Sequence, residues 1–295
     1  MAANSGIALV TDSTASISPE DRERLGVEVV NLYVILNGEQ QPENEIADYG
    51  QFYREVIESP TLTTTSQPSI GDFMEVYEPL LEQGKDIVSI HLSAAISGTF
   101  EAARQAAEQL ESEGKGGERI TVVDSKITAG GLAFAMLTAS NAVADGASTQ
   151  ETVDRVMAAR DRMENWIMVD TLDYLKKGGR IGNAQAWIGS ALKIKPIITL
   201  EETVEPVEKV RTQKRAMQRL RDIASERASE ETEYVWTAQH IQAPELAASL
   251  ADHCREVFGS EGVFLDEMST VLGCHAGPGL VALGVVPAEL VGNRR

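Results

Sequence analysis

The sequence has few cysteines and no long apolar run, and each absence excludes a class of protein. The two cysteines, Cys254 and Cys274, are too few for a disulfide framework and are typical of a reducing compartment. No apolar run reaches the ~18 residues expected of a membrane span. The N-terminus shows no charged segment followed by a long apolar one, so no signal peptide is indicated. We therefore expect a soluble, cytoplasmic protein.

Several common chemical signatures are also missing. The adjacent pairs His253-Cys254 and Cys274-His275 lack the usual spacing of metal ligands. The chain contains neither a Gly-x-x-x-x-Gly-Lys phosphate loop nor a Gly-x-Ser-x-Gly elbow. Basic residues are scarce as well, since 26 Lys and Arg against 45 Asp and Glu give a net charge of −19. We therefore expect no metal, no cofactor and no nucleic-acid partner.

The N-terminal half alternates short apolar runs with helical segments, which predicts a parallel α/β sheet. Hydrophobic residues make up 43% of the chain but aromatic residues only 5%, so the core is expected to be aliphatic. The expected strands here are Ile7–Val10, Val27–Leu36, Ile87–Leu92 and Ile120–Val123. A brief helix is expected to open at Ser18. The other expected helices span Asp48–Ser59, Ile70–Glu82, Phe100–Glu111, Thr128–Ala144 and Thr149–Glu164.

After about residue 160 several strands follow one another without helices between them, which predicts a mixed sheet. We therefore expect two domains, an N-terminal parallel-sheet α/β/α domain over residues 1–160 and a C-terminal mixed-sheet α/β domain over residues 161–295. The expected C-terminal strands are Trp166–Asp170, Ile197–Leu200, Val204–Val210, Tyr234–His240, Val263–Met268 and Leu280–Val286. The expected helices lie near Asn183–Leu192 and over Lys214–Ser229 and Pro244–Phe258.

A run of hydroxyl side chains precedes the helix expected at Ile70. Its members are Thr63, Thr64, Thr65 and Ser66, followed by Gln67-Pro68-Ser69. Such a run is a poor helix interior, and Pro68 favours an extended conformation before it. Hydroxyl groups beside a helix N-terminus suit a carboxylate or a phosphate. A solvated loop is the ordinary alternative.

A second hydroxyl-bearing turn, Ser97-Gly98-Thr99, follows the strand expected at Ile87–Leu92. Gly98 has no side chain, so a ligand can approach the backbone closely. Ser97 or Thr99 also fits the N-cap of the following helix, and a capping turn is itself an anion site. Ligands of parallel sheets bind beyond the carboxyl ends of the strands, so we expect this turn to lie near the first hydroxyl run.

Two further residues stand in glycine-rich surroundings. His275 lies in Gly273-Cys274-His275-Ala276-Gly277-Pro278-Gly279, which predicts a tight loop rather than a helix face. There it could donate to an anion or relay a proton. Arg180 follows Gly178-Gly179 and could orient a carboxylate, or be an ordinary surface arginine.

Basic residues gather between positions 176 and 221, which hold eleven of the 26. Such a cluster in an acidic chain predicts a docking face for an acidic partner or a phosphate-bearing ligand. For Arg219 and Arg221 we favour an ordinary solvated helix face. The cluster consists of Lys176, Lys177, Arg180, Lys193, Lys195, Lys209, Arg211, Lys214, Arg215, Arg219 and Arg221.

Taken in order, these motifs resemble the DegV family of bacterial fatty-acid-binding proteins, from Ile7 to about Val286. The segment before Ser97-Gly98-Thr99 departs from the family, reading Ser93-Ala94-Ala95-Ile96. The motifs are Val10-Thr11-Asp12-Ser13-Thr14, Thr64-Thr65-Ser66-Gln67-Pro68-Ser69, Ile96-Ser97-Gly98-Thr99, Val123-Asp124-Ser125-Lys126, Tyr174-Leu175-Lys176-Lys177-Gly178-Gly179-Arg180-Ile181, Lys209-Val210-Arg211-Thr212 and His275-Ala276-Gly277-Pro278-Gly279.

The resemblance implies one long-chain fatty acid buried between the two domains, with its carboxylate held by Thr65 and Ser97. It also implies that the protein is not an enzyme but delivers the fatty acid to a fatty-acid kinase, a role in phospholipid metabolism. A transient membrane contact is compatible with that role, and we expect a monomer. The supporting network would be Thr64, Ser66, Gly98, Arg180 and His275, and the kinase-facing residues Lys209, Arg211, Lys214 and Arg215.

Two other functions fit the same residues. One is an enzyme on a small phosphorylated or carboxylated substrate, with His275 as acid and base and Thr65, Ser97 and Arg180 as the anion site. A Ser–His hydrolase would need a base beside Ser97 and an ordered acid, for which Asp12 or Asp124 could be proposed, but nothing in the sequence fixes that geometry. The other is a regulatory protein whose basic face binds a macromolecule, which the net charge of −19 disfavours.

Overall fold

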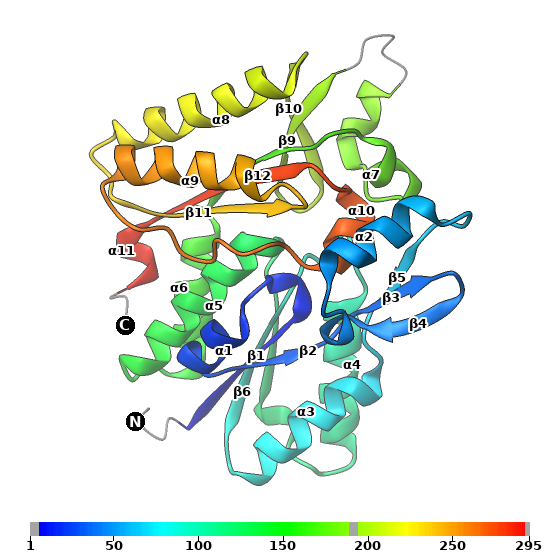
Figure 1. The fold of residues 1–295 in the computed structure, drawn as a ribbon. Coiled ribbons are helices and arrows are strands. Elements are labelled where there is room, and N and C mark those ends of the chain that lie inside the picture. Colours follow the sequence, from blue (N-terminus) through cyan, green and yellow to red (C-terminus); the bar gives the residue numbers. More distant parts are fainter. Residues whose placement is uncertain (1–5, 189–193, 293–295) are drawn as a thin grey trace.

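The protein consists of two large β-sheets with helices between them and on their outer faces (Figure 1). The computed structural model describes residues 6–188 and 194–292. Buried clusters link the layers in the order helix, sheet, helix, sheet, helix. The α/β class with a parallel N-terminal sheet is thereby confirmed.

The N-terminal sheet is parallel and has the strand order β2-β1-β6-β7. Helices α3 and α4 cover one face through a cluster that includes Phe73 and Leu110, and α5 and α6 cover the other. The strands are β1 Ile7–Asp12, β2 Val27–Val30, β6 Asp86–His91 and β7 Ile120–Asp124. The helices of this half are α1 Pro19–Leu25, α2 Tyr49–Glu58, α3 Ile70–Glu82, α4 Thr99–Ser112, α5 Ala129–Ala144 and α6 Thr149–Arg160, with 3-10 turns η1 Ser13–Ala15, η2 Glu43–Glu45 and η3 Gly117–Arg119.

The C-terminal sheet has the strand order β10-β9-β8-β12-β11, and all four of its strand pairs are antiparallel rather than mixed as expected. Helices α8 and α9 cover its outer face around the fully buried Trp236. The strands are β8 Glu164–Met168, β9 Lys195–Leu200, β10 Val204–Val210, β11 Tyr234–Ile241 and β12 Leu280–Pro287. The helices are α7 Asp173–Lys177, α8 Gln213–Ala228, α9 Pro244–Phe258, α10 Thr270–Ala276 and α11 Ala288–Val291, with the 3-10 helix η4 Gly182–Trp187.

Helices α5 and α6 form the layer that the two sheets share. Leu132 to Met136 of α5 belong to a buried cluster that also contains Leu9 of β1 and Val286 of β12. The last strand of the parallel sheet, β7, precedes α5 and α6, and the first strand of the C-terminal sheet, β8, follows them, so the boundary predicted near residue 160 falls between the two large sheets. The division into two domains at that point stays a prediction.

A third, small sheet corrects one expected strand. Val27–Leu36 is not continuous: β2 ends at Val30, and β3 Tyr33–Leu36 pairs instead with β4 Glu39–Pro42 and β5 Thr64–Ser66. The backbone leaves the parallel sheet where the Leu32 N–H donates to Ser13 Oγ at 3.0 Å. Hydrophobicity alone could not reveal this change of sheet, because both strands are β-branched and apolar.

Local signals placed several helices well. Helix α3 has Ser69 as its N-cap, and Asp72 completes a capping box, as the expected start at Ile70 requires.

The segment expected as strand Val263–Met268 is instead a loop with one bridge between His240 and Glu267. The helix expected near Asn183–Leu192 is η4, and residues 189–192 lie outside the described residues.

Candidate ligand-binding site

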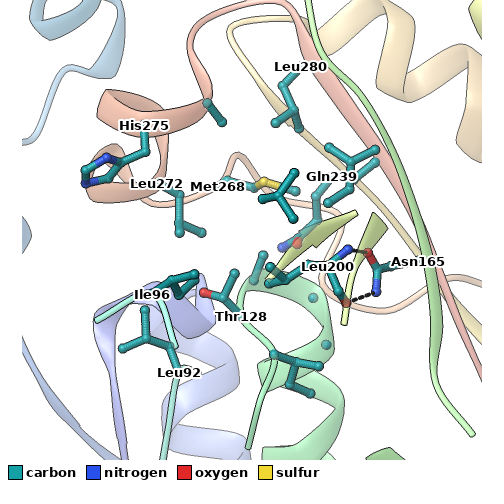
Figure 2. A pocket seen from close by; sticks show the side chains of 18 of the residues that line it. Leu92, Ile96, Thr128, Asn165, Leu200, Gln239, Met268, Leu272, His275 and Leu280 are labelled. Carbon is teal, nitrogen blue, oxygen red and sulfur yellow. Dashed lines mark hydrogen bonds between the residues drawn. The ribbon is translucent and has the colours of Figure 1, made fainter. Parts of the chain in front are cut away.

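A cavity of about 400 Å³ lies between the helices that follow the parallel strands and the inner face of the C-terminal sheet. Its walls are mainly aliphatic, and Figure 2 shows Leu92, Leu200, Met268 and Leu280 around it. Four of the predicted site residues, Thr65, Ser97, Arg180 and His275, line this one cavity. A space of this size and lining is typical of sites for small organic ligands.

Thr65 and His275 meet at the wall of the cavity. Thr65 sits in β5, whose pairing with β3 sets Thr65 opposite Val34. His275 belongs to α10, so the tight loop expected around it is wrong: the helix runs to Ala276 and the turn begins at Gly277. Thr65 Oγ1 and His275 Nε2 share a hydrogen bond of 2.8 Å. This contact joins the small N-terminal sheet to the C-terminal half.

The glycines near His275 are explained by close packing. A Cβ on Gly178 would lie 2.4 Å from His275 Nδ1, and one on Gly277 would lie 2.3 Å from the Tyr174 ring. Gly277 also has φ of +79°, which glycine adopts without strain. The imidazole therefore packs directly against the backbone of the Gly178-Gly179 turn.

The pKa of His275 is lowered from its ordinary 6.5 to about 4, because burial disfavours the charged ring and the nearby Arg180 repels it. The ring is therefore neutral at neutral pH. Its Nδ1 atom is buried and has no hydrogen-bond partner among the described residues.

Arg180 connects the two loops that flank the cavity mouth. Its Nε donates to the Ile96 carbonyl at 3.1 Å, and a terminal nitrogen donates to the Gly178 carbonyl at 2.7 Å. The side chain has no ion-pair partner among the described residues, whereas eight of the fifteen described arginines have one. Its guanidinium therefore supplies positive charge without a carboxylate partner in the cavity that Thr65 and Ser97 also line.

Ser97 holds the start of α4. Its hydroxyl accepts from the Thr99 N–H at 3.3 Å and lies 2.9 Å from Thr99 Oγ1. The N-cap position itself belongs to Gly98, so the cap expected at Ser97 or Thr99 is shifted by one residue. A Cβ on Gly98 would lie 2.0 Å from the Gln67 side chain, so the turn packs directly on the first hydroxyl run.

The other predicted network residues divide into two groups. Ser66 and Gly98 line the cavity. Thr64 is exposed and is not among the residues that line it.

Sequence reasoning missed two polar residues inside the cavity, Thr128 and Gln239. Gln239 is 1% exposed, and neither of its amide atoms has a partner among the described residues. The Thr128 hydroxyl is likewise buried and unpartnered. The available signal was a glutamine in the middle of the strand Tyr234–Ile241, every residue of which is buried.

Glu43 was also missed, and it positions α10. Its carboxylate accepts from Thr270 Oγ1 and from the Val271 N–H, both at 3.1 Å. Glu43 is 4% exposed, and burial raises the pKa of its carboxyl group. An acidic group at the N-terminus of the helix that carries His275 is favourable to the helix dipole.

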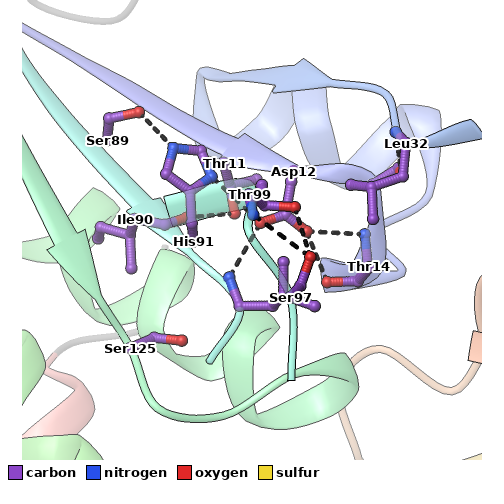
Figure 3. Close-up of polar contacts among 12 residues, drawn as sticks. Thr11, Asp12, Thr14, Leu32, Ser89, Ile90, His91, Ser97, Thr99 and Ser125 are labelled. Atoms are coloured by element: carbon purple, nitrogen blue, oxygen red, sulfur yellow. Dashed lines mark hydrogen bonds and ion pairs between the residues drawn. The ribbon is translucent and has the colours of Figure 1, made fainter. Parts of the chain in front are cut away.

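Asp12 serves a separate, structural network (Figure 3). Its carboxylate lies 3.1 Å from His91 Nδ1, while His91 Nε2 lies 2.7 Å from Ser89 Oγ, which also contacts the Tyr77 hydroxyl. All four side chains are completely buried. Asp124 instead accepts from the Ala94 and Lys126 N–H groups. Among the described residues neither aspartate hydrogen-bonds to His275, so neither orders that ring as the acid of a Ser–His hydrolase would.

The predicted docking residues Lys209, Arg211, Lys214 and Arg215 are exposed around the start of α8. None has an ion-pair partner within residues 6–188 and 194–292. Lys209 Nζ lies 5.0 Å from the centre of the Trp187 ring. By contrast, Arg219 pairs with Glu208 and Glu226, and Arg221 donates to Ser249, as expected of solvated helix residues. Lys193 of the same cluster lies outside the described residues.

The described residues contain neither a candidate metal cluster nor a membrane-spanning helix. No group of three or more His, Cys, Asp or Glu side chains in them could hold a metal ion. No helix in the described part of the chain is long and apolar enough to cross a membrane.

Fold and cavity together define a two-sheet α/β protein that encloses an apolar space beside a group of hydroxyls. A family model described as "Uncharacterised protein, DegV family" matches residues 6–288. A DegV domain-containing protein of Streptomyces coelicolor is 39% identical over 283 residues, covering 95% of this chain and 97% of that protein. Protein DegV of Bacillus subtilis is 34% identical over 281 residues, covering 95% and 98%. The chain belongs to the DegV family.

Solved structures agree with this assignment. The chain is similar to a fatty-acid-binding DegV family protein from Thermus thermophilus, with a TM-score of 0.85, 31% identity and coverage of 95% of this chain and 99% of that one. It is equally similar to DegV of Bacillus subtilis, described as a fatty acid binding protein, with a TM-score of 0.85, 32% identity and the same coverage.

Proposed function

We propose that this protein binds one long-chain fatty acid in the central cavity and presents the carboxylate to a fatty-acid kinase. The observation that carries the proposal is the composition of that cavity, an aliphatic space of about 400 Å³ with Thr65, Ser97 and His275 on its wall. The two fatty-acid-binding relatives with a TM-score of 0.85 support the same ligand class.

The acyl tail would supply most of the affinity. Burial of one methylene group contributes about 0.8 kcal/mol, so a chain of about fifteen would contribute roughly 12 kcal/mol before entropy losses. The polar groups would then set the orientation of the ligand rather than its overall affinity.

The carboxylate would be held by hydroxyl donors at Thr65 and Ser97. In the tautomer with its proton on Nε2, His275 donates to Thr65 Oγ1, and Nδ1, which has no partner among the described residues, carries no proton. Thr65 then accepts from His275 and can donate its own proton to the ligand. The positive charge of Arg180 would favour the ionised carboxylate in this partly desolvated setting.

Delivery to a kinase would use the exposed basic residues near the start of α8. This chain has a net charge of −19, yet four basic residues are exposed together at this place: Lys209, Arg211, Lys214 and Arg215. An unpaired basic surface of this kind would steer an acidic partner surface into place.

The alternative of an enzyme with His275 as acid and base is less well supported. Efficient general acid–base groups have a pKa near the working pH, whereas burial lowers the pKa of His275 to about 4. The aliphatic lining of the cavity also fits an acyl chain better than a small phosphorylated substrate.

Native mass spectrometry of the purified protein, followed by denaturing extraction, tests the proposed ligand. We expect one long-chain fatty acid per chain. The variant Thr65→Ala/Ser97→Ala should fold but lose or loosen the lipid, while Thr61→Ala/Ser112→Ala, which removes two exposed hydroxyls, should keep it. Stoichiometric lipid in the first variant would show that the carboxylate site is assigned wrongly. A wild-type protein that neither carries nor takes up fatty acid would overturn the proposed function.

A further inference from the structure

The cavity contains a second polar site, distinct from the Thr65 and Ser97 hydroxyls. Gln239 projects from β11 into the cavity, and both its amide nitrogen and its amide oxygen are buried without a partner among the described residues. Leaving such groups unpaired is costly, and nearly all buried polar groups in folded proteins are hydrogen-bonded. The side chain is therefore well placed to receive a ligand group.

The first turn of α5 forms the opposite side of this site. Thr128 occupies the N-cap position, yet its side chain makes no capping hydrogen bond and its hydroxyl is buried and unpartnered. The first backbone N–H groups of a helix have no partner within the helix, and Ala129, Gly130 and Gly131 line the cavity here. A Cβ on Gly130 would lie 3.0 Å from Gln239 Oε1, so the amide reaches this turn.

The remaining polar side chains nearby are already satisfied. Asn165 donates to the Leu200 carbonyl and accepts from the Leu200 N–H, each at 2.9 Å. Thr237 Oγ1 donates to the Phe264 carbonyl at 2.8 Å. Figure 2 shows the Gln239 amide among the aliphatic side chains, between His275 on one side of the view and Asn165 on the other. Besides His275 Nδ1, the unpartnered side-chain atoms of the described lining residues are therefore those of Gln239 and Thr128.

Building on the proposed function, we propose that Gln239, Thr128 and the start of α5 bind a hydroxyl group carried on the acyl chain, so that the protein takes hydroxylated long-chain fatty acids. An alcohol can donate to the Gln239 amide oxygen and accept from its N–H or from the helix N–H groups. A keto group would leave the amide oxygen unpaired, and a carboxylate would face that oxygen unfavourably. Of these three groups, only the alcohol both donates and accepts, as the two halves of the amide require.

Competition between stearic acid and its hydroxylated derivatives tests this site. Delipidated protein is mixed with equimolar stearic acid and one monohydroxystearic acid, in a series with the hydroxyl near the carboxylate, mid-chain or near the methyl end, and native mass spectrometry gives the bound ratio. We expect one position in the series to be favoured by roughly threefold to tenfold, the effect of one or two hydrogen bonds. Gln239→Met, which keeps the side-chain size, should abolish that preference. Gln105→Met, on the exposed face of α4, should not.

The outcomes separate the two proposals. If wild-type protein binds stearic acid but favours no hydroxylated isomer, the hydroxyl site is overturned while fatty-acid binding stands; these atoms then hold water. A preference that survives Gln239→Met also overturns it. If neither kind of acid binds, the proposed function fails and the hydroxyl site fails with it.

Discussion

Thr65 Oγ1 lies 2.8 Å from His275 Nε2, although 210 positions of sequence separate the two residues. This contact connects the hydroxyl run of the small N-terminal sheet to the helix of the C-terminal half that Glu43 anchors. Both residues line the central cavity. The position of the His275 ring should therefore control ligand retention.

Gly178→Ala tests that dependence. The new Cβ would lie 2.4 Å from His275 Nδ1, so the ring must turn and break its hydrogen bond with Thr65. We expect the fatty-acid content to fall severalfold, with only about 1–2 kcal/mol lost from the free energy of unfolding. Extraction of bound lipid and chemical denaturation measure the two effects. Gly71→Ala, where the nearest atom lies 3.5 Å from the new Cβ, is the control and should retain its lipid.

Titration of His275 gives a second prediction. Its pKa in the folded, ligand-free protein is about 4, below the ordinary 6.5. Between these values the unfolded chain binds a proton at this residue and the folded protein does not, so the free energy of unfolding falls as the pH is lowered from about 6.5 to 4. A bound carboxylate should raise the pKa of His275, because opposite charge favours the protonated ring. NMR titration of the imidazole with and without fatty acid measures both values, and a ligand-free pKa near 6.5 would contradict the expectation.

Charge reversal should separate partner binding from lipid binding. Arg211→Glu/Lys214→Glu alters two exposed residues near the start of α8 and no cavity residue. We expect phosphorylation of the bound fatty acid by a fatty-acid kinase to be abolished, with lipid content unchanged. Arg104→Glu/Lys115→Glu makes the same change in net charge on another face and should leave phosphorylation intact. Equal phosphorylation of all three proteins would remove this surface from the proposal.

The buried network around His91 should affect stability alone. Ser89 Oγ lies 2.7 Å from both the Tyr77 hydroxyl and His91 Nε2, so Ser89→Ala leaves two buried polar groups without a partner. We expect a loss of about 1–3 kcal/mol in the free energy of unfolding and a full complement of fatty acid. Loss of lipid from a folded Ser89→Ala protein would show that this network also supports the cavity.

Much of the secondary structure follows from local sequence signals. Helix α3 begins at Ile70 because Ser69 and Asp72 form a capping box, and α9 begins at Pro244, where a missing N–H costs nothing. Strand positions were predicted where apolar runs were long enough to be buried on both faces. The motifs also predicted four of the residues that the cavity brings together, Thr65, Ser97, Arg180 and His275.

Other features depend on tertiary contacts that no local pattern encodes. Helix α10, which carries His275, is capped locally by Ser269, but Glu43, far away in the sequence, also accepts from its first turn. The segment after Val263 runs beside the outer edge of β11 and forms only one bridge with it, between His240 and Glu267. Gln239 and Thr128 line one cavity because α5 is packed between the two sheets.

The sequence by itself determined most of the elements, the family and the kinds of side chain near the cavity, because capping, periodicity and motif order are local properties. The tertiary structure alone decided which polar groups are paired and which face the cavity unpaired. Hydrogen-bond partners, burial and the lowered pKa of His275 arise from residues brought together across hundreds of positions. Whether a polar group is buried without a partner depends on how the chain packs. The Gln239 amide of β11 is such a group because α5 packs over it.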